Sequence, residues 1–259
     1  MEDAGELSRR QFSAHAERYV TSRDHRSSES LDRLVALAAP RPEWSVLDIA
    51  TGGGHTALAL APHVREVVAS DLTREMLSAA ERFIREKGAT NVSFREADAC
   101  TLPFADAAFD LVTCRVAPHH FADVGRFVRE CARVVKPGGR VIVIDNLAPD
   151  DPDAAAHFNA IEKTRDPSHQ RAYNEAEWVA FFRDAGLRVE RVEHFRKRRE
   201  FDFWAGMQGV DAPTGERLRA MFRDAPPGAK TALAPEEHEG RLSFYLDEIL
   251  ILASSAPPA

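Results

Sequence analysis

Residues 44–61 read WSVLDIATGGGHTALALA, and this stretch decides the fold class of the chain. A short apolar segment, a cluster of glycines and a run of alanine and leucine follow one another, which is typical of a strand, a tight turn and a helix start. Glycines let a ligand approach bare main chain, and the first turn of a helix presents unpaired N–H groups. The stretch therefore predicts a nucleotide-binding turn.

The turn alone leaves two kinds of nucleotide open. Gly52–Ala57 formally matches the dinucleotide fingerprint, with alanine in the last glycine position, and that short pattern is weak by itself. Asp48 lies before the turn, at the end of the predicted strand. A nicotinamide site has no need of an acid there, because its acidic residue belongs on the ribose. The position of Asp48 thus favours a different nucleotide.

Residues 46–61 resemble motif I of the class I S-adenosylmethionine-dependent methyltransferases, which has the form acid-x-Gly-x-Gly-x-Gly. Here the acid is Asp48, and Ala50 replaces the first glycine, so this position must accept a Cβ. The resemblance implies S-adenosyl-L-methionine as the cofactor. It places five motif residues at the cofactor site: Asp48, Ala50, Thr51, Gly52 and Gly54.

Two further aspartates follow predicted strands at 66–71 and 92–97. Asp71 stands where a carboxylate accepts the ribose hydroxyls of an adenosine, or it caps the next helix. In the family, the acid at Asp98 accepts the exocyclic amine of adenine, while the alternative is an ordinary turn residue. Residues beside these acids would line the adenine or belong to the core: Leu72, Met76 and Ala99.

Residues 109–112 and 136–140 resemble two more family segments, the beginning of strand four and the turn before strand five. A nicotinamide dehydrogenase does not require them at this spacing. The family motifs together cover about residues 44–145. Because the three aspartates each lie at or near a strand end, their agreement is more informative than any one of them.

The methyl acceptor is expected beside residues 115–121, which follow strand four. They contain neither the Asn-Pro-Pro-aromatic sequence of amino-methylating nucleic-acid enzymes nor the Pro-Cys pair of cytosine C5 enzymes. The arrangement resembles instead the small-molecule group that includes the ubiquinone and menaquinone C-methyltransferases. Tyr19 is also assigned to the cofactor site through a looser likeness to that group.

Our catalytic hypothesis is that His119 or His120 deprotonates or orients the acceptor, and that Asp145 holds an imidazole or the acceptor hydroxyl. A histidine with a pKa near neutrality suits the removal of an acceptor proton. The alternative is that one histidine is buried and hydrogen-bonded while the other is on the surface. Arg115 either holds the carboxylate of the cofactor or contributes only backbone.

The predicted fold is α/β, a doubly wound, Rossmann-like sheet of seven strands, mostly parallel with an antiparallel last strand. Residues 1–43 form a helical lid, or helices that merely cover the sheet. Residues 44–253 form the methyltransferase domain, with helical additions at 150–185 and 198–238 over the acceptor site. Polar residues 165–173 and aromatic residues 201–207 line the acceptor pocket, or they are loop and core. Residues 254–259 form a disordered tail.

Composition sets limits on partners. The chain has 259 residues, 44% of them hydrophobic, and a formal net charge of −7, which makes nucleic acid a poor default partner. The longest apolar runs fall short of a membrane span of about 20 residues, and acidic residues near the N-terminus argue against a secretion signal. We therefore expect a cytoplasmic protein with a small-molecule acceptor, no membrane partner, no bound metal and a possible homodimer.

The predicted function is transfer of a methyl group to oxygen or carbon of a small metabolite by in-line displacement, with assistance from a histidine. Two alternatives stay open at this point. One is a nicotinamide-dependent oxidoreductase, and the other is a protein that binds the adenosyl cofactor without catalysis.

Overall fold

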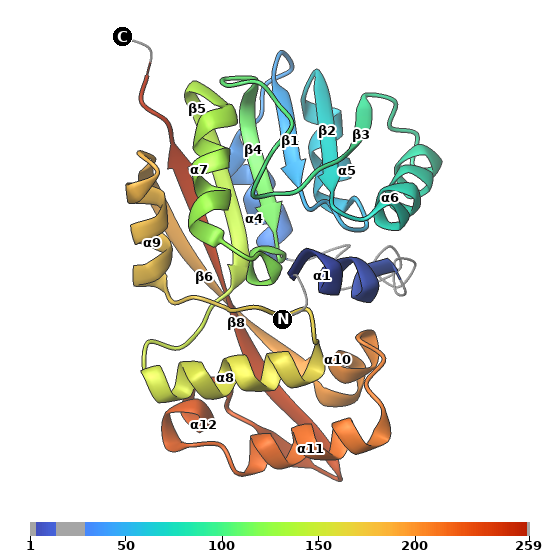
Figure 1. Cartoon of the computed structure of the whole chain (residues 1–259), viewed down its shortest axis with the longest axis vertical. Coiled ribbons are helices and arrows are strands. Elements are labelled where there is room, and N and C mark those ends of the chain that lie inside the picture. Colours follow the sequence, from blue (N-terminus) through green and yellow to red (C-terminus); the bar gives the residue numbers. More distant parts are fainter. Residues whose placement is uncertain (1–3, 14–28, 258–259) are drawn as a thin grey trace.

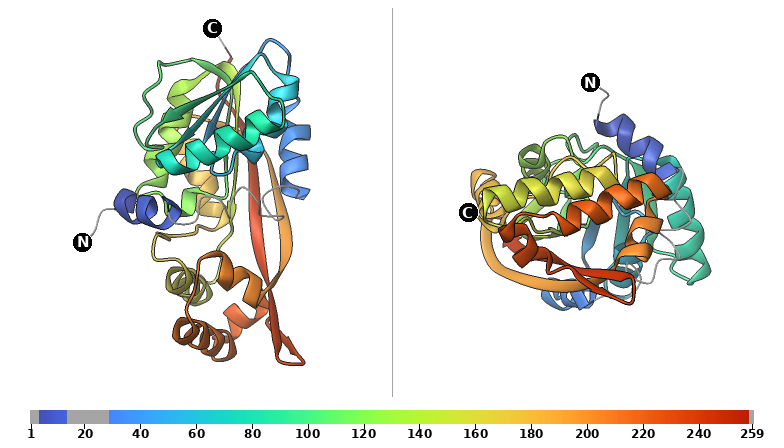
Figure 2. Two further views of the ribbon diagram at one scale, coloured as in Figure 1. Left: turned by 90° about the vertical axis from the view of Figure 1, so that its right-hand side faces the viewer. Right: turned by 90° about the horizontal axis from the view of Figure 1, so that it is seen from below.

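Two tiers make up the molecule, an α/β body and a smaller helical cover (Figure 1). The computed structural model describes residues 4–13 and 29–257. Two long strands, β6 (Arg188–Glu200) and β8 (Arg241–Ser254), run from the body into the cover. Helix α1 (Ala4–Ser13) lies between the tiers on one side (Figure 2).

A single sheet forms the frame of the body. Within the described residues its strands follow the order β3-β2-β1-β4-β5-β8-β6, and a short β7 pairs with β8. Strands β3, β2, β1, β4 and β5 are parallel, whereas β8 is antiparallel to both β5 and β6. The mostly parallel sheet with an antiparallel last strand is therefore confirmed, with β7 as an addition to the seven expected strands. The remaining strands are β1 Ser45–Ile49, β2 Glu66–Asp71, β3 Val92–Glu96, β4 Phe109–Arg115, β5 Val135–Asn146 and β7 Glu236–His238.

Helices cover both faces of this sheet, as doubly wound folds require. Buried residues of α4, α5 and α6 pack on one face, and those of α7 and α9 pack on the other. The helices are α4 Glu29–Ala38, α5 His55–Leu60, α6 Arg74–Glu86, α7 Val124–Val134, α8 Pro152–Arg165, α9 Glu175–Asp184, α10 Phe201–Met207, α11 Ala212–Arg223 and α12 Pro227–Leu233, with 3₁₀ turns η1 Ala61–His63 and η2 Pro118–His120.

The cover has a hydrophobic core of its own. Helix α8 packs against α11 and α12, and the aromatic side chains of Phe158, Trp204, Phe222 and Phe244 meet between them and β8. Helix α9 packs instead against α7 and β6. The predicted addition at 150–185 is thus divided, because α8 belongs to the cover and α9 to the body.

Strand β6 is longer than the sequence suggested. The alternating residues 187–192 predict a strand that ends near Val192, with helical material from residue 198, whereas β6 continues to Glu200. Its basic residues find acidic partners across the ladder: Arg196 lies 2.9 Å from Asp247, and Lys197 lies 2.6 Å from Glu248. Cross-strand ion pairs therefore allow a charged segment to remain a strand.

Two chain segments near β5 also differ from expectation. Phe109 pairs with Val135 and Leu111 with Arg140, so the predicted turn at 136–139 is a bulge within β5. The tail begins later than residue 254, because Ser254 ends β8 and the N–H of Ser255 donates to the carbonyl of Gly139. Backbone hydrogen bonds to the bulge therefore order the chain at least as far as residue 256.

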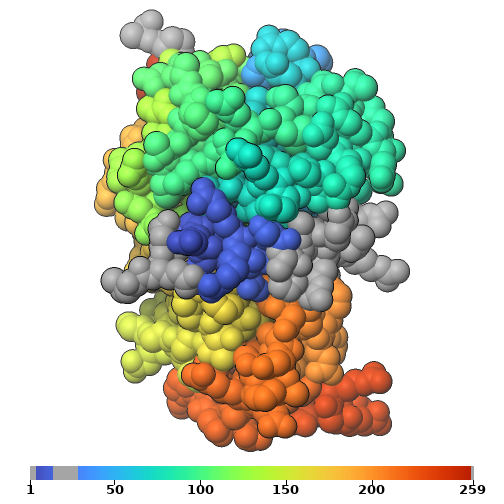
Figure 3. All heavy atoms as spheres, turned by 45° about the vertical axis from the view of Figure 1, so that its right-hand side comes forward, coloured from blue at the N-terminus to red at the C-terminus, as the bar shows by residue number. Residues whose placement is uncertain are grey.

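The N-terminal helices occupy different places. Helix α4 buries Leu31, Leu34 and Ala38 against the body, as the sequence pattern predicted. Helix α1 lies across the junction of the tiers (Figure 3), where Phe12 packs against Met76 and Ala79. The predicted continuation of the Phe12 face through Ala16 and Tyr19 falls outside the described residues.

Ala50 provides a test of the turn. Its φ of +50° lies in the left-handed region, which costs an L-residue about 1–2 kcal/mol. Glycine removes this cost but makes the unfolded chain more flexible by about 0.4–1 kcal/mol. We expect Ala50→Gly to raise the free energy of unfolding by about 0.5–1 kcal/mol in urea denaturation. The control Ala156→Gly, at an exposed position of α8, should lower it by about 1 kcal/mol; a destabilised A50G protein would contradict the turn geometry.

Candidate active site

A cavity of about 310 Å³ opens at the carboxyl ends of β1, β2 and β4. This edge of an open parallel sheet is where ligands bind in doubly wound folds. We call it the first cavity. Most of the residues that the sequence assigned to the cofactor line it: Asp48, Ala50, Thr51, Gly52, Asp71, Leu72, Met76, Asp98, Ala99 and Arg115. Tyr19 lies outside the described residues.

Asp48 holds the turn to the neighbouring strand. One carboxylate oxygen accepts a hydrogen bond of 2.7 Å from the Thr51 hydroxyl, and the other accepts one of 2.8 Å from the Thr113 hydroxyl on β4. The side chain is almost fully buried. Burial raises the pKa of Asp48 to about 6, although both hydroxyls and the charge of Arg115 oppose the shift.

Asp71 closes the opposite wall of the turn. Its two oxygens accept backbone hydrogen bonds of 3.0 Å, one from the N–H of Gly52 and one from the N–H of Thr73. Burial raises the pKa of Asp71, and these N–H groups oppose the shift. Because Thr73 occupies the N-cap position of α6, Asp71 is not the cap itself. A carboxylate accepts up to about four hydrogen bonds, so Asp71 keeps capacity for ribose hydroxyls.

Gly54 lies apart from the other motif residues and does not line the first cavity. It has a φ of +82°, and a Cβ at this position would meet Ile84 Cδ1 at 2.8 Å and Ala80 Cβ at 3.2 Å. Glycine is needed here because α5 and α6 pack closely, so direct contact with a cofactor is not what requires it.

Asp98 fits both of its interpretations. It lines the first cavity and is exposed, as a residue that receives an adenine amine would be. Its carboxylate also accepts a hydrogen bond of 2.8 Å from the N–H of Cys100, the geometry of an Asx turn.

A second cavity of about 100 Å³ adjoins the first. Phe12, Arg115, Val116 and His120 line both cavities. The cover closes the second cavity with three residues of the aromatic segment singled out in the sequence, Phe203, Trp204 and Met207, while Phe201 lies in the core of the cover.

His119 and Asp145 form a buried pair at the wall of the second cavity. His119 Nδ1 lies 2.5 Å from Asp145 Oδ1, and both side chains are almost completely buried. Burial alone would lower the pKa of His119, but the charge and hydrogen bond of Asp145 outweigh it and raise this pKa above its ordinary value. The sequence hypothesis that Asp145 holds an imidazole is thus realised at His119.

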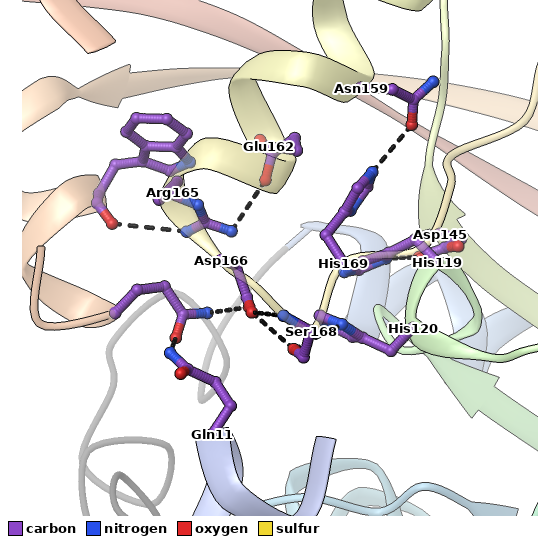
Figure 4. A network of polar contacts seen from close by, with 12 residues as sticks. Gln11, His119, His120, Asp145, Asn159, Glu162, Arg165, Asp166, Ser168 and His169 are labelled. Atoms are coloured by element: carbon purple, nitrogen blue, oxygen red, sulfur yellow. Dashed lines mark hydrogen bonds and ion pairs between the residues drawn. The ribbon is translucent and has the colours of Figure 1, made fainter. Parts of the chain in front are cut away.

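His120 belongs to a different polar network (Figure 4). Its Nδ1 lies 3.1 Å from the hydroxyl of Ser168, which donates to Asp166 at 2.5 Å. Burial, together with the nearby His119, lowers the pKa of His120 to about 3. His119 is thus the buried, hydrogen-bonded histidine, while His120 is partly buried, borders both cavities and stays neutral.

The network extends beyond the histidines to residues that the sequence did not identify. Asp166 also accepts a hydrogen bond of 2.7 Å from Gln208, and the Oε1 of Gln208 accepts one of 2.9 Å from Gln11 of α1 (Figure 4). In the sequence, only the polar composition of residues 165–173 pointed to this network. Of that segment, Arg165 lines the second cavity. Ser168 and His169 are buried behind that wall rather than at a rim.

Comparison with known proteins identifies the family. A methyltransferase domain family matches residues 47–143. The uncharacterized methyltransferase YcgJ of Bacillus subtilis is 37% identical over 242 residues, which cover 93% of this chain and 96% of YcgJ. The chain is a class I S-adenosylmethionine-dependent methyltransferase. Its membership decides against the oxidoreductase and the non-catalytic binding protein that the sequence left open.

Solved structures agree with this membership. The crystal structure of YcgJ superposes on the methyltransferase with a TM-score of 0.85 and 37% identity, covering 88% of this chain and 99% of YcgJ. A demethylmenaquinone methyltransferase of Thermus thermophilus is 42% identical over 115 residues, which are 44% of this chain and 52% of that enzyme. The likeness to the quinone enzyme is therefore partial.

The first cavity suits the cofactor of this methyltransferase. Gly52 presents bare main chain to this cavity. A Cβ at this position would lie 3.8 Å from the Met76 methyl group. Asp71 and Asp98 supply acceptors for hydroxyl and amine groups, and Arg115 supplies a cation. These donors and acceptors match the adenosine and the amino-acid portion of S-adenosylmethionine.

The helices and the potential metal ligands of residues 4–13 and 29–257 can be described directly. Every helix in these residues is too short or too polar to cross a lipid bilayer. In the same residues, His, Cys, Asp and Glu side chains form no group of three or more arranged to hold a metal ion.

The raised pKa of Asp48 predicts a pH effect on stability. The native state holds the Asp48 proton up to about pH 6, whereas the unfolded chain releases it near pH 4, so this group contributes stability at low pH that is lost as the pH rises from about 4 to 6. Over this interval, the free energy of unfolding of Asp48→Asn should therefore rise relative to that of the wild type by up to about 3 kcal/mol, as measured by urea denaturation at each pH. Asp106→Asn, at an exposed acid, should follow the wild type. Parallel curves for D48N and wild type would contradict the shift.

Proposed function

We propose that this methyltransferase transfers a methyl group to oxygen or carbon of a small metabolite, with His119 as the general base. The observation that carries the proposal is the His119–Asp145 hydrogen bond at the wall of a cavity that adjoins the first cavity. When bound, S-adenosylmethionine supplies a methyl group on a positively charged sulfur. The chain must then orient the acceptor, remove its proton and exclude water.

His119 is suited to proton removal. With Nδ1–H donating to Asp145, the neutral ring leaves Nε2 able to accept a proton, and Nε2 makes no hydrogen bond to the described residues. Asp145 stabilises the imidazolium that results. His120 stays neutral and lies at the boundary between the cavities. Its hydrogen bond with Ser168 and its contact with the ring of Phe12 hold it there.

The cofactor residues have complementary roles in this proposal. Asp71 accepts the ribose hydroxyls, Asp98 accepts the adenine amine, and Arg115 binds the carboxylate of the methionine portion. Leu72, Met76 and Ala99 give the adenine an apolar wall. Thr51 and Gly52 present the turn itself. This set is supported by its position around one cavity at the strand ends.

A small acceptor is supported by the 100 Å³ size of the second cavity and by the small-molecule enzymes among the relatives. The demethylmenaquinone methyltransferase matches over only about half its length, so we do not extend its acceptor to this chain. A cytoplasmic location and a homodimer stay predictions.

Substitution of the pair tests the base. Because general-base catalysis contributes about 10²–10⁴-fold, His119→Gln should lower turnover by that factor while S-adenosylmethionine affinity changes less than twofold. Turnover is measured as release of S-adenosylhomocysteine with an acceptor found by screening. The control His157→Gln, whose ring contacts the carbonyl of Met221 in the cover, should retain turnover.

The pH profile gives a second measurement on the same pair. The base must be neutral, so wild-type turnover should fall as the pH drops below the raised pKa of His119. Asp145→Asn removes the charge that raises this pKa, and the acidic limb of the profile should move to lower pH as the maximal rate falls. Unchanged turnover in both H119Q and D145N would remove the base from the proposal.

The ribose contact is tested by cofactor affinity. Asp71→Asn replaces an acceptor by a donor facing Gly52 and the ribose, and should weaken S-adenosylhomocysteine binding at least about tenfold in calorimetry. Glu96→Gln, at the end of β3 and paired with Arg74 outside the first cavity, should bind normally. Equal affinity of D71N and wild type would show that the ribose is held elsewhere.

A further inference from the structure

Guanidinium groups dominate the charge on the wall of the second cavity. Among the residues that the structure describes, Arg115, Arg165 and Arg199 line it, together with one carboxylate, Glu248. Glu248 is already in contact with Lys197 at 2.6 Å, while Arg199 Nη2 lies farther from it, at 3.8 Å. The lining of this cavity is therefore cationic, although the whole chain carries a net charge of −7.

The other acids near this cavity stand behind its wall and have partners of their own. Glu162 pairs with Arg165 at 2.9 Å, and Arg165 stacks on the ring of Trp204 at 4.6 Å. Asp145 is held by His119, and Asp166 accepts hydrogen bonds from Ser168 and Gln208. These acids are absent from the lining, so an anion that enters meets three guanidinium groups and the carboxylate of Glu248, which Lys197 already neutralises.

Asn146 is a second, independent sign of a ligand. It ends β5 directly after Asp145, lines the second cavity and is 7% exposed. Its side-chain amide makes no hydrogen bond to the described residues and borders the cavity. Polar groups in protein interiors are nearly always paired, so a polar ligand group is the natural partner of this amide.

The size and mouth of the cavity limit the ligand. Its volume of about 100 Å³ is below that of a cavity that holds benzene, about 150 Å³, so a carboxylate and the few atoms next to it fit inside, while a ring attached to them must lie outside. Phe203 lines it and is 49% exposed, which provides an apolar surface at the entrance.

We propose that the second cavity recognises a carboxylate-bearing acceptor, with the carboxylate held by Arg199 and Arg165 and a neighbouring oxygen held by the Asn146 amide. This inference rests on the proposed function, because it names the substrate class of the same site. Planar guanidinium groups match carboxylate geometry, and Arg–carboxylate contacts in a partly dry site are strong enough to decide selectivity.

The test uses benzoate and its neutral isostere benzamide, titrated into the full-length enzyme saturated with S-adenosylhomocysteine. Saturation keeps the probes from Arg115 on the cofactor side. We expect benzoate to bind at least tenfold more tightly than benzamide. Arg199→Gln should lower benzoate affinity at least tenfold and remove the preference, whereas its strand neighbour Arg198→Gln, paired with Glu200 and Ser243, should change it less than twofold.

Asn146→Asp provides a second variant. Its added negative charge should lower benzoate affinity at least tenfold and leave S-adenosylhomocysteine affinity unchanged. Equal affinity of the wild-type complex for the two probes, or binding of neither, would overturn the inference. So would benzoate affinity that is unaffected in both R199Q and N146D. Failure of S-adenosylhomocysteine to bind the wild type would instead refute the cofactor assignments of the proposed function, so the two failures are distinguishable.

Discussion

The buried carboxylate of Asp48 is the interaction on which the rest of the site depends. Its hydrogen bonds to Thr51 and Thr113 fix the turn after β1 against the end of β4. The turn thereby faces Asp71, whose carboxylate accepts a hydrogen bond from the N–H of Gly52. Burial of this acid costs free energy, as its raised pKa shows. The hydrogen bonds that the buried carboxylate accepts hold the cavity wall in position.

A second constraint places the cofactor cavity and the acceptor cavity next to each other. The end of β4 carries Arg115, and the turn that follows carries His119 and His120, so residues close in sequence border both cavities. The pair of imidazoles is then differentiated by their neighbours. Asp145 makes His119 more basic, whereas burial and the nearby His119 keep His120 neutral. Two adjacent side chains of one type therefore acquire different proton affinities from their surroundings.

The sequence predicted the body of the fold well because its signals there are local. The strand, turn and helix at 44–61, the acids at strand ends and the apolar helix faces each declare themselves within a few residues, and the cavity gathers them as expected. The role of Gly54 was less accessible, because the close packing of Ile84 against it involves a helix 30 residues farther along the chain.

The acceptor side was harder to predict for the same physical reason. Asn146, Gln208 and Arg199 reach the second cavity from β5, the end of α10 and β6, and no spacing in the sequence links them. The length of β6 was also missed, since its basic residues are matched by acids on β8, more than 50 residues away. Contacts of this kind are set by the tertiary structure and leave no periodic pattern.

The continuity of β6 and β8 has a mechanical consequence. Their antiparallel ladder runs from the body into the cover, from Arg188 opposite Ser254 to Glu200 opposite Ser243, with one shift of register between Val189 and Arg191. Because main-chain hydrogen bonds join the two strands along this length, paired strands and not loops alone tie the cover to the body. Helix α1 contacts the body through Phe12 and through Ser13, whose hydroxyl donates to Glu75, and it contacts the cover through Gln11 at Gln208. A shift of this one short helix would therefore disturb contacts with both tiers at once.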